Sequence, residues 1–273
     1  MKKKKPFSII VPVHNESDNI LPLLYEFDST FGRHDTFEVI YVDDASTDST
    51  ARVLRAALAK FTWLRVIEHD QQCGQSAALC SGIAVALTSV IATLDGDGQN
   101  DPSDIPRLLD LYQASSQETM LAGHRVNRQD DFLKRVSSRV ANVARSSYLS
   151  DGIPDTGCGL KVFSRELFLH FEPFDHMHRF LPALAISQGA LVKSVPVNHR
   201  ERIKGETKYG LHNRLWVGIE DMLGVRWVQQ SRSIERKCLG KKRLSHLQNW
   251  KDRRGQAWLN RRQCDAQSQE IIQ

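Results

Sequence analysis

Paired cysteines are missing from this sequence. Its 273 residues include five cysteines, an odd number, and no two of them stand in a CxxC arrangement. A disulfide framework or a zinc site built on CxxC pairs is therefore not expected, and the cysteine pattern favours a reducing compartment.

A long hydrophobic run is missing as well. Residues 71–94 carry no charge, but Ser81 and Gly82 interrupt the apolar pattern, and Asp95 follows directly. A membrane helix needs about 20 apolar residues, so we expect a helix, a turn and a buried strand here instead. The basic start MKKKKPF is followed only by the short apolar run 7–13, with no cleavage site after it. We therefore predict no secretory leader and no transmembrane helix, and expect a cytoplasmic chain.

An excess of charge is confined to one end of the chain. Residues 1–230 sum to a net charge of −2, whereas residues 231–273 hold eleven Lys or Arg and four acids, a net charge of +7. We expect one globular domain over 1–230 and a basic C-terminal tail, helical or disordered, over 231–273. Such a tail suits nucleic acid or an anionic membrane surface. We predict no nucleic-acid partner, because the chain contains no RNA-binding motif.

Short apolar runs alternate with segments of helical periodicity in the first half of the chain. This alternation predicts a three-layer α/β/α fold with a mostly parallel central sheet, in which ligands bind at the carboxyl ends of the strands. The predicted strands cover 7–13, 37–42, 64–67, 90–94 and 120–122. The predicted helices cover 19–31, 46–61, 75–87 and 105–112.

Acidic residues follow the predicted strands. Asp43 and Asp44 close one strand, and the sequence DGDGQNDP at 95–102 follows another. Carboxylate and carboxamide oxygens between glycines suit a Mg²⁺ or Mn²⁺ ion that shares a diphosphate. Taken alone, the 95–102 segment could equally be an acidic turn that caps the next helix.

Three sequence blocks, 11–16 (VPVHNE), 42–48 (VDDASTD) and 95–102, resemble the family-2 glycosyltransferases, which have the Rossmann-like GT-A fold. Further blocks are similar to the dolichyl-phosphate mannose synthase branch, which includes bacterial polyprenyl-phosphate glycosyltransferases. These blocks lie at 123–125, 134–139, 155–161, 178–182 and 200–210, and the resemblance covers residues 7 to 229.

The resemblance implies an inverting transfer of a sugar from a UDP- or GDP-linked donor to a polyprenyl phosphate such as undecaprenyl or dolichyl phosphate. Asp97 and Gln99 would hold Mg²⁺ or Mn²⁺. Arg125, Arg135 and Ser138 would bind the acceptor phosphate. The nucleotide-sugar would be bound by Pro12, Asn15, Glu16, Asp43, Asp44, Asp95, Arg202 and Lys208. Ala45 departs from the family pattern, which usually has glycine there.

The chemistry of a phosphate acceptor agrees with this assignment. A phosphate monoester has a second pKa of about 6 and is already an anionic nucleophile at pH 7, so it needs no general base. Asp97, Arg125, Arg135 and Asp155 are the residues that we expect to act in catalysis. Asp155 could be a base or could orient the arginines, and we favour the orienting role. The alternative function is transfer to a sugar hydroxyl in cell-envelope polysaccharide or lipopolysaccharide synthesis, where Asp155 would be the base.

A lipid acceptor requires contact with a membrane. Residues 210–229 form an amphipathic pattern that fits an interfacial helix or a helix packed on the domain's own core. Together with the basic tail, this segment predicts peripheral attachment to the inner face of the membrane. The sequence leaves homo-oligomer formation open. His176 and His178 are expected to pack in a loop rather than bind a metal, and Cys158 to be a small buried residue.

Overall fold

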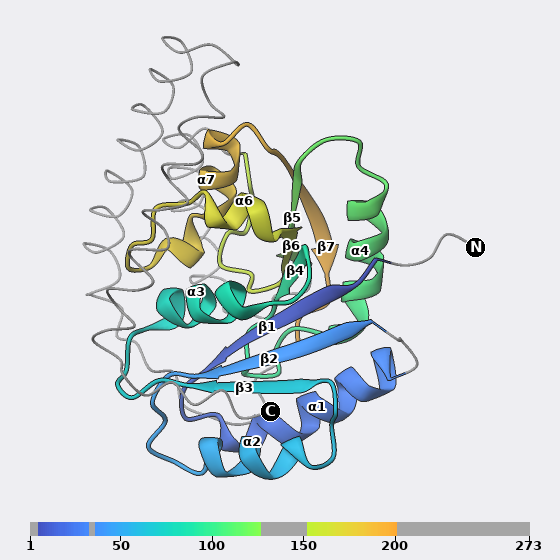
Figure 1. Ribbon diagram of the computed structural model, residues 1–273. Coiled ribbons are helices and arrows are strands. Elements are labelled where there is room, and N and C mark those ends of the chain that lie inside the picture. Colours follow the sequence, from blue (N-terminus) through green and yellow to red (C-terminus); the bar gives the residue numbers. More distant parts are fainter. Residues whose placement is uncertain (1–4, 33–35, 127–151, 201–273) are drawn as a thin grey trace, which may run out of the picture.

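The computed structural model describes residues 5–32, 36–126 and 152–200 (Figure 1). Four predicted site residues, Arg135, Ser138, Arg202 and Lys208, lie outside these ranges, as do the predicted amphipathic helix at 210–229 and the tail at 231–273. Their roles and the domain boundary at residue 230 therefore stay predictions. Within the described ranges, no helix combines the length and the apolar character that crossing a membrane would require.

A seven-stranded sheet forms the centre of the described part, with the strand order β3-β2-β1-β4-β6-β5-β7. Strands β1 to β4 run parallel, and β5 runs parallel to β7, whereas β6 is antiparallel to both β4 and β5. The mostly parallel sheet predicted from the sequence is therefore confirmed. The strands are β1 (Phe7–Val13), β2 (Phe37–Asp43), β3 (Leu64–Glu68), β4 (Val90–Thr93), β5 (Thr119–Arg125), β6 (Lys161–Ser164) and β7 (Leu191–Val197).

Helices cover both faces of the sheet, which gives three layers (Figure 1). One hydrophobic cluster joins α1, α2 and α4 to alternate strand residues such as Ile9 and Val11. The other cluster joins α3, α6 and α7 to the opposite strand residues such as Ile10 and Val42. Because both faces are covered, β1, β2 and β4 are apolar along nearly their whole length. The helices are α1 (Ser17–Phe31), α2 (Thr50–Leu58), α3 (Gln75–Val85), η1 (Pro102–Asp104), α4 (Ile105–Gln113), α6 (Arg165–Leu169), η2 (Met177–Arg179) and α7 (Leu181–Ser187).

Two predicted helix starts were wrong. Helix α1 begins at Ser17, so Asn19 lies inside it and donates to the Glu16 carboxylate at 2.7 Å instead of capping the helix. Helix α2 begins at Thr50, because Ser46 and Thr47 bond to the loop that follows β1. The polar residues near a predicted helix start thus did not reveal which of them bond to a neighbouring loop instead of capping the helix.

Strands β6 and β7 were not predicted.

Helix α3 packs unusually close to the sheet at Gly82. A Cβ atom at this position would lie 2.5 Å from Ile10 Cγ2 and 3.1 Å from Val42 Cγ2. The close packing of the α3 backbone against β1 and β2 therefore depends on the absence of a side chain at Gly82.

The η2 turn holds the other side of α3. His178 Nδ1 lies 2.9 Å from Ser76 Oγ, and the His178 backbone N–H donates to the same oxygen at 3.3 Å. Burial, followed by the positive charges of Arg179 and Lys161 and by His176, lowers the pKa of His178 to about 3. His178 is therefore neutral at pH 7. It packs against α3 as a structural residue, although it lies in the 3-10 helix η2 and not in the loop that the sequence predicted.

We expect Gly82→Ala to destabilise the protein by about 1–2 kcal/mol, although alanine favours a helix by about 1 kcal/mol over glycine, because the added methyl group overpacks the α3–β1 contact. Urea unfolding measures the change. Ile10→Ala removes the contacting atom, so Gly82→Ala should cost less in an Ile10→Ala background than in the wild type. A Gly82→Ala protein more stable than the wild type would contradict the close approach.

The buried His178 predicts a loss of stability in acid. The unfolded chain binds a proton at this side chain below pH about 6.5, whereas the folded chain does not until pH about 3, so stability falls as pH falls through that window. His178→Gln lacks this linkage. Its stability relative to wild type should therefore rise by about 1–2 kcal/mol between pH 7.5 and pH 5 in urea unfolding. A difference that does not change with pH would show that His178 titrates normally.

Candidate functional site

The carboxyl ends of β1, β2 and β4 lie side by side, because these three strands are parallel neighbours. Val13 at the end of β1 is in register with Asp43 at the end of β2, and Asp95 follows the end of β4 after Leu94. The three sequence blocks at 11–16, 42–48 and 95–102 therefore meet at one edge of the sheet (Figure 1). This edge is the candidate functional site.

The loops after β1 and β2 are bonded to each other. Asn15 Oδ1 accepts from the backbone N–H groups of Thr47 at 2.7 Å and Asp48 at 3.3 Å, and the Asn15 N–H donates to Ser46 Oγ at 2.8 Å. Asp43 accepts from both the N–H and the hydroxyl of Ser46. Burial raises the pKa of Asp43, although these bonds lower it. Asn15, predicted to line a nucleotide pocket, thus ties the two loops together, and Asp43, predicted for the same pocket, fixes the loop after β2.

Two residues of these loops adopt backbone angles that favour glycine. Asn15 has a φ of 55° and Ala45 a φ of 54°. Ala45 stands where the family usually has glycine, and its left-handed backbone gives the physical reason for that preference. Pro12 and Glu16 complete the β1 side, where the Glu16 N–H donates to Thr50 Oγ1 at 2.9 Å.

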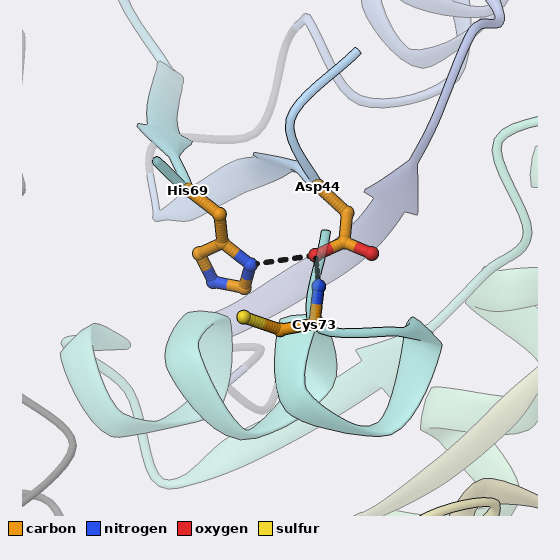
Figure 2. Close-up of side chains that lie close together, drawn as sticks. All are labelled: Asp44, His69 and Cys73. Carbon is orange, nitrogen blue, oxygen red and sulfur yellow. Dashed lines mark hydrogen bonds and ion pairs between the residues drawn. The ribbon is translucent and has the colours of Figure 1, made fainter. Parts of the chain in front are cut away.

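Asp44 bonds to His69 and to Cys73, which lie on two other segments of the chain (Figure 2). It accepts from His69 Nδ1 at 2.8 Å, from the Cys73 N–H at 2.8 Å and from the Gly74 N–H at 2.7 Å. Burial alone would raise the pKa of Asp44, but the hydrogen bonds from His69, Cys73 and Gly74 bring it below its ordinary value. Sequence reasoning missed His69 and Cys73. The position of His69 directly after β3 was the available signal.

Asp95 and Asp97 place two carboxylates close together after β4. Burial, and then the charge of Asp97, raises the pKa of Asp95 to about 6, while Lys161 and Arg125 act in the opposite direction. Gln75 Nε2 donates to Asp95 Oδ1 at 2.9 Å. A Cβ atom at Gly159 would overlap the Asp95 carboxyl group, so the carboxyl packs directly on the backbone there.

Gln99 lies beside this acidic pair. Its backbone N–H donates to Asp97 Oδ1 at 3.1 Å, and its Nε2 donates to the Arg200 carbonyl at 3.4 Å. With the amide nitrogen engaged, the amide oxygen is the end of Gln99 that can serve a cation. Asp97 and Gln99 thus present hard oxygen atoms beside a second carboxylate, a donor set that fits Mg²⁺ or Mn²⁺.

Arg125 and Asp155 form a two-pronged ion pair. Arg125 Nε lies 2.7 Å from Asp155 Oδ2 and Arg125 Nη2 lies 2.8 Å from Asp155 Oδ1, and both side chains are largely buried. Both carboxylate oxygens of Asp155 therefore bond to the same guanidinium. This geometry favours an orienting role for Asp155, as the sequence interpretation held.

A buried lysine that was given no role from the sequence lies beneath these groups. The ammonium group of Lys161, on β6, donates hydrogen bonds to the carbonyls of Thr156, at 3.4 Å, and of Cys158. Burial lowers the pKa of Lys161, and the nearby charges of Cys158, Asp95 and Asp155 oppose the shift. The ammonium thus holds the 155–160 loop, which carries both Asp155 and Gly159.

Ten of the fourteen predicted site residues lie in the described ranges, and the structure brings these residues or their loops together. The ten are Pro12, Asn15, Glu16, Asp43, Asp44, Asp95, Asp97, Gln99, Arg125 and Asp155.

Gly74 and Gln75 connect the two halves of the site, since the Gly74 N–H bonds to Asp44 and the Gln75 side chain bonds to Asp95. Arg200 forms ion pairs with Glu26 at 2.7 Å and with Asp101 at 2.9 Å, and these two carboxylates balance its positive charge.

Comparison with known proteins gives relatives of this chain. A dodecaprenyl-phosphate galacturonate synthase of Rhizobium johnstonii is 35% identical over 227 residues, which cover 80% of this chain and 65% of the relative. An undecaprenyl-phosphate 4-deoxy-4-formamido-L-arabinose transferase of Pseudomonas fluorescens is 34% identical over 206 residues, covering 74% of this chain and 59% of the relative. The chain thus spans less than two thirds of the length of these curated relatives.

Solved structures share the fold. A glucosyl-3-phosphoglycerate synthase of Mycobacterium tuberculosis, in complex with Mn²⁺, uridine diphosphate and phosphoglyceric acid, superposes with a TM-score of 0.62 at 16% identity and covers 82% of this chain and 78% of its own. This similarity confirms the GT-A fold. The family model described as glycosyl transferase family 2 matches residues 8–171, which is more than half of the sequence. The chain belongs to glycosyl transferase family 2.

Proposed function

We propose that this chain is an inverting glycosyltransferase that transfers a sugar from a UDP- or GDP-linked donor to a polyprenyl phosphate, with Mg²⁺ or Mn²⁺ as cofactor. One observation carries the proposal: the acidic pair Asp95–Asp97 lies in the same site as the buried Arg125, whose orientation Asp155 controls. The site thus offers oxygen ligands for a cation and, on Arg125, N–H groups that Asp155 does not use and that can bind an anionic acceptor. The names of the polyprenyl-phosphate relatives support the acceptor class.

The donor side follows from the loops after β1 and β2. The bonded loops of Asn15, Asp43 and Asp44 would form the wall against which the nucleoside lies. Asp97 and Gln99 would hold the divalent ion beside them. That ion, when bound, would neutralise charge on the nucleoside diphosphate as it leaves. The solved neighbour of the same fold that carries Mn²⁺ and uridine diphosphate agrees with this arrangement.

The acceptor side follows from Arg125. A guanidinium held at two points can offer its remaining N–H groups in a fixed direction, which suits a phosphate oxygen better than a flexible ammonium would. Because the phosphate is itself the nucleophile, Asp155 need not accept a proton. Both Asp155 oxygens already accept from Arg125, which disfavours transfer to a sugar hydroxyl with Asp155 as the base. Arg135 and Ser138 would add further contacts to the phosphate.

We also propose that the enzyme works as a peripheral protein on the inner face of a membrane, since a polyprenyl acceptor lies in the bilayer. The segments expected to contact the membrane, 210–229 and 231–273, lie outside the described residues. Formation of a homo-oligomer stays a separate prediction from the sequence.

A donor and acceptor screen tests the proposed reaction. With Mg²⁺ or Mn²⁺, undecaprenyl or dolichyl phosphate should accept sugar from a UDP- or GDP-sugar. The sugar in the extracted lipid product should have the anomeric configuration opposite to that in the donor, as measured by NMR. Asp97→Ala should lower the rate at least about 100-fold, because the cation loses a ligand, and chelator should abolish activity. Asp110→Ala, on the exposed side of α4, is the matched control and should retain activity. Transfer to undecaprenol or to sugar alcohols instead of the lipid phosphate would contradict the proposal.

Asp155→Asn separates an orienting role from a base. The amide loses one acceptor for Arg125, so the guanidinium is held less well. We expect the KM for polyprenyl phosphate to rise about 10-fold with a smaller change in kcat, and with the pH profile of kcat unchanged. Steady-state kinetics at saturating donor measure both parameters, and thermal melting checks the fold. A kcat reduced about 1000-fold with an unchanged KM would assign Asp155 as a base.

A further inference from the structure

Three side chains of different chemistry converge beside the nucleotide-side loops (Figure 2). Asp44, His69 and Cys73 each have a potential ligand atom, and these atoms all lie within 4.8 Å of one another. Asp44 follows β2, His69 follows β3 and Cys73 precedes α3, so the fold and not a local motif brings them together. Asp44 and His69 are buried, whereas Cys73 is partly exposed, and its thiol therefore forms the more open side of the cluster.

The combination of ligand atoms points to one class of metal. A carboxylate oxygen, an imidazole nitrogen and a thiolate sulfur suit Zn²⁺, whereas Mg²⁺ and Mn²⁺ prefer oxygen atoms alone. Tetrahedral Zn²⁺ with bonds of about 2.0–2.3 Å separates neighbouring ligand atoms by roughly 3.3–3.7 Å. The Asp44–His69 pair, now 2.8 Å apart, would have to open by about half an ångström, a movement within reach of side-chain rotation.

Contacts behind the cluster resemble the outer shell of a metal site. His69 Nε2 lies 2.9 Å from Ser81 Oγ, which fixes the imidazole ring from its far side. The N–H groups of Cys73 and Gly74 hold the Asp44 carboxylate at 2.8 and 2.7 Å. Metal-binding histidines usually donate their second ring N–H to an oxygen atom, and metal-binding carboxylates usually accept hydrogen bonds. Both requirements can be met here without moving the backbone.

The proton changes on metal binding can be accounted for. Without metal, His69 Nδ1–H donates to the Asp44 carboxylate and Nε2 accepts from the Ser81 hydroxyl. With metal, the Nδ1 lone pair binds the ion and the proton resides on Nε2, from where it donates to Ser81 Oγ after the hydroxyl hydrogen rotates away. The Cys73 thiol, which donates to the Gln71 carbonyl at 3.3 Å without metal, gives up this hydrogen bond and releases its proton to solvent.

We propose that Asp44, His69 and Cys73 form a Zn²⁺ site with a fourth position for water or another ligand. This site is separate from the Asp97–Gln99 oxygen site and selects a different class of ion. Because Asp44 also belongs to the proposed nucleotide pocket, a Zn²⁺ ion here would inhibit the transfer reaction. That last consequence rests on the proposed function, whereas the metal site does not.

Cobalt spectroscopy on the full chain tests the site. Co²⁺ added to chelator-treated protein should give a near-ultraviolet charge-transfer band from a thiolate ligand, saturating at one ion per chain, and Zn²⁺ should displace it. Cys73→Ser should abolish the band and weaken Zn²⁺ binding at least about 10-fold by calorimetry, and His69→Gln should weaken binding similarly. Cys80→Ala is the matched control, since it removes a buried thiol from α3 outside the cluster, and it should keep the band. Thermal melting verifies that each variant folds.

Absence of the band, or a band that survives Cys73→Ser, would overturn the proposed site. Neither result involves a sugar donor or an acceptor, so failure here would leave the proposed glycosyl transfer unaffected. In the transfer assay, Zn²⁺ should inhibit wild type and Cys80→Ala at concentrations that leave Cys73→Ser active. Equal inhibition of all three proteins would contradict an inhibitory role for this site.

Discussion

The Asp95 carboxylate is the group on which the arrangement of the site depends. It follows β4, which lies between the parallel strand β1 and the antiparallel strand β6, so it meets segments from both halves of the sheet. Gln75 of α3 donates to it, the Gly159 backbone packs on it, and Lys161 and Arg125 offset the burial and the charge of Asp97. The carboxylates of Asp95 and Asp97 and the positive side chains of Lys161 and Arg125 must therefore lie in the same site, because either set alone would leave uncompensated buried charge.

A single turn couples this carboxylate to the nucleotide side of the site. The Gly74 N–H bonds to Asp44, and the next side chain, Gln75, bonds to Asp95. Gly74 has a φ of 86°, which an L-amino acid with a side chain rarely adopts, and the close contact at Gly82 holds the same helix against β1. The start of α3 therefore fixes the positions of Asp44 and Asp95 relative to each other. The His69 and Cys73 contacts with Asp44 belong to the same region of the fold.

Local patterns predicted part of this organisation. Apolar runs indicated β1, β2 and β4, and the acids that close the second and third of these runs placed Asp43, Asp44 and Asp95 at one edge. The antiparallel strand β6 was not predicted, because only two of its four residues, Val162 and Phe163, are apolar, which is too short a run to indicate a strand. The starts of α1 and α2 were wrong because Asn19, Ser46 and Thr47 bond to other residues of the loops, a choice that propensity does not express.

The sequence alone determined that a parallel α/β sheet would form and that its strand ends would be acidic, since burial of both sheet faces imposes a hydrophobic period that neighbouring residues display. Only the tertiary structure decided which groups pair there. His69 reaches Asp44 across 25 positions, Arg125 reaches Asp155 across 30, and Ser76 meets His178 across 102. Desolvation and charge pairing depend on which distant segments pack together, and no local pattern contains that information.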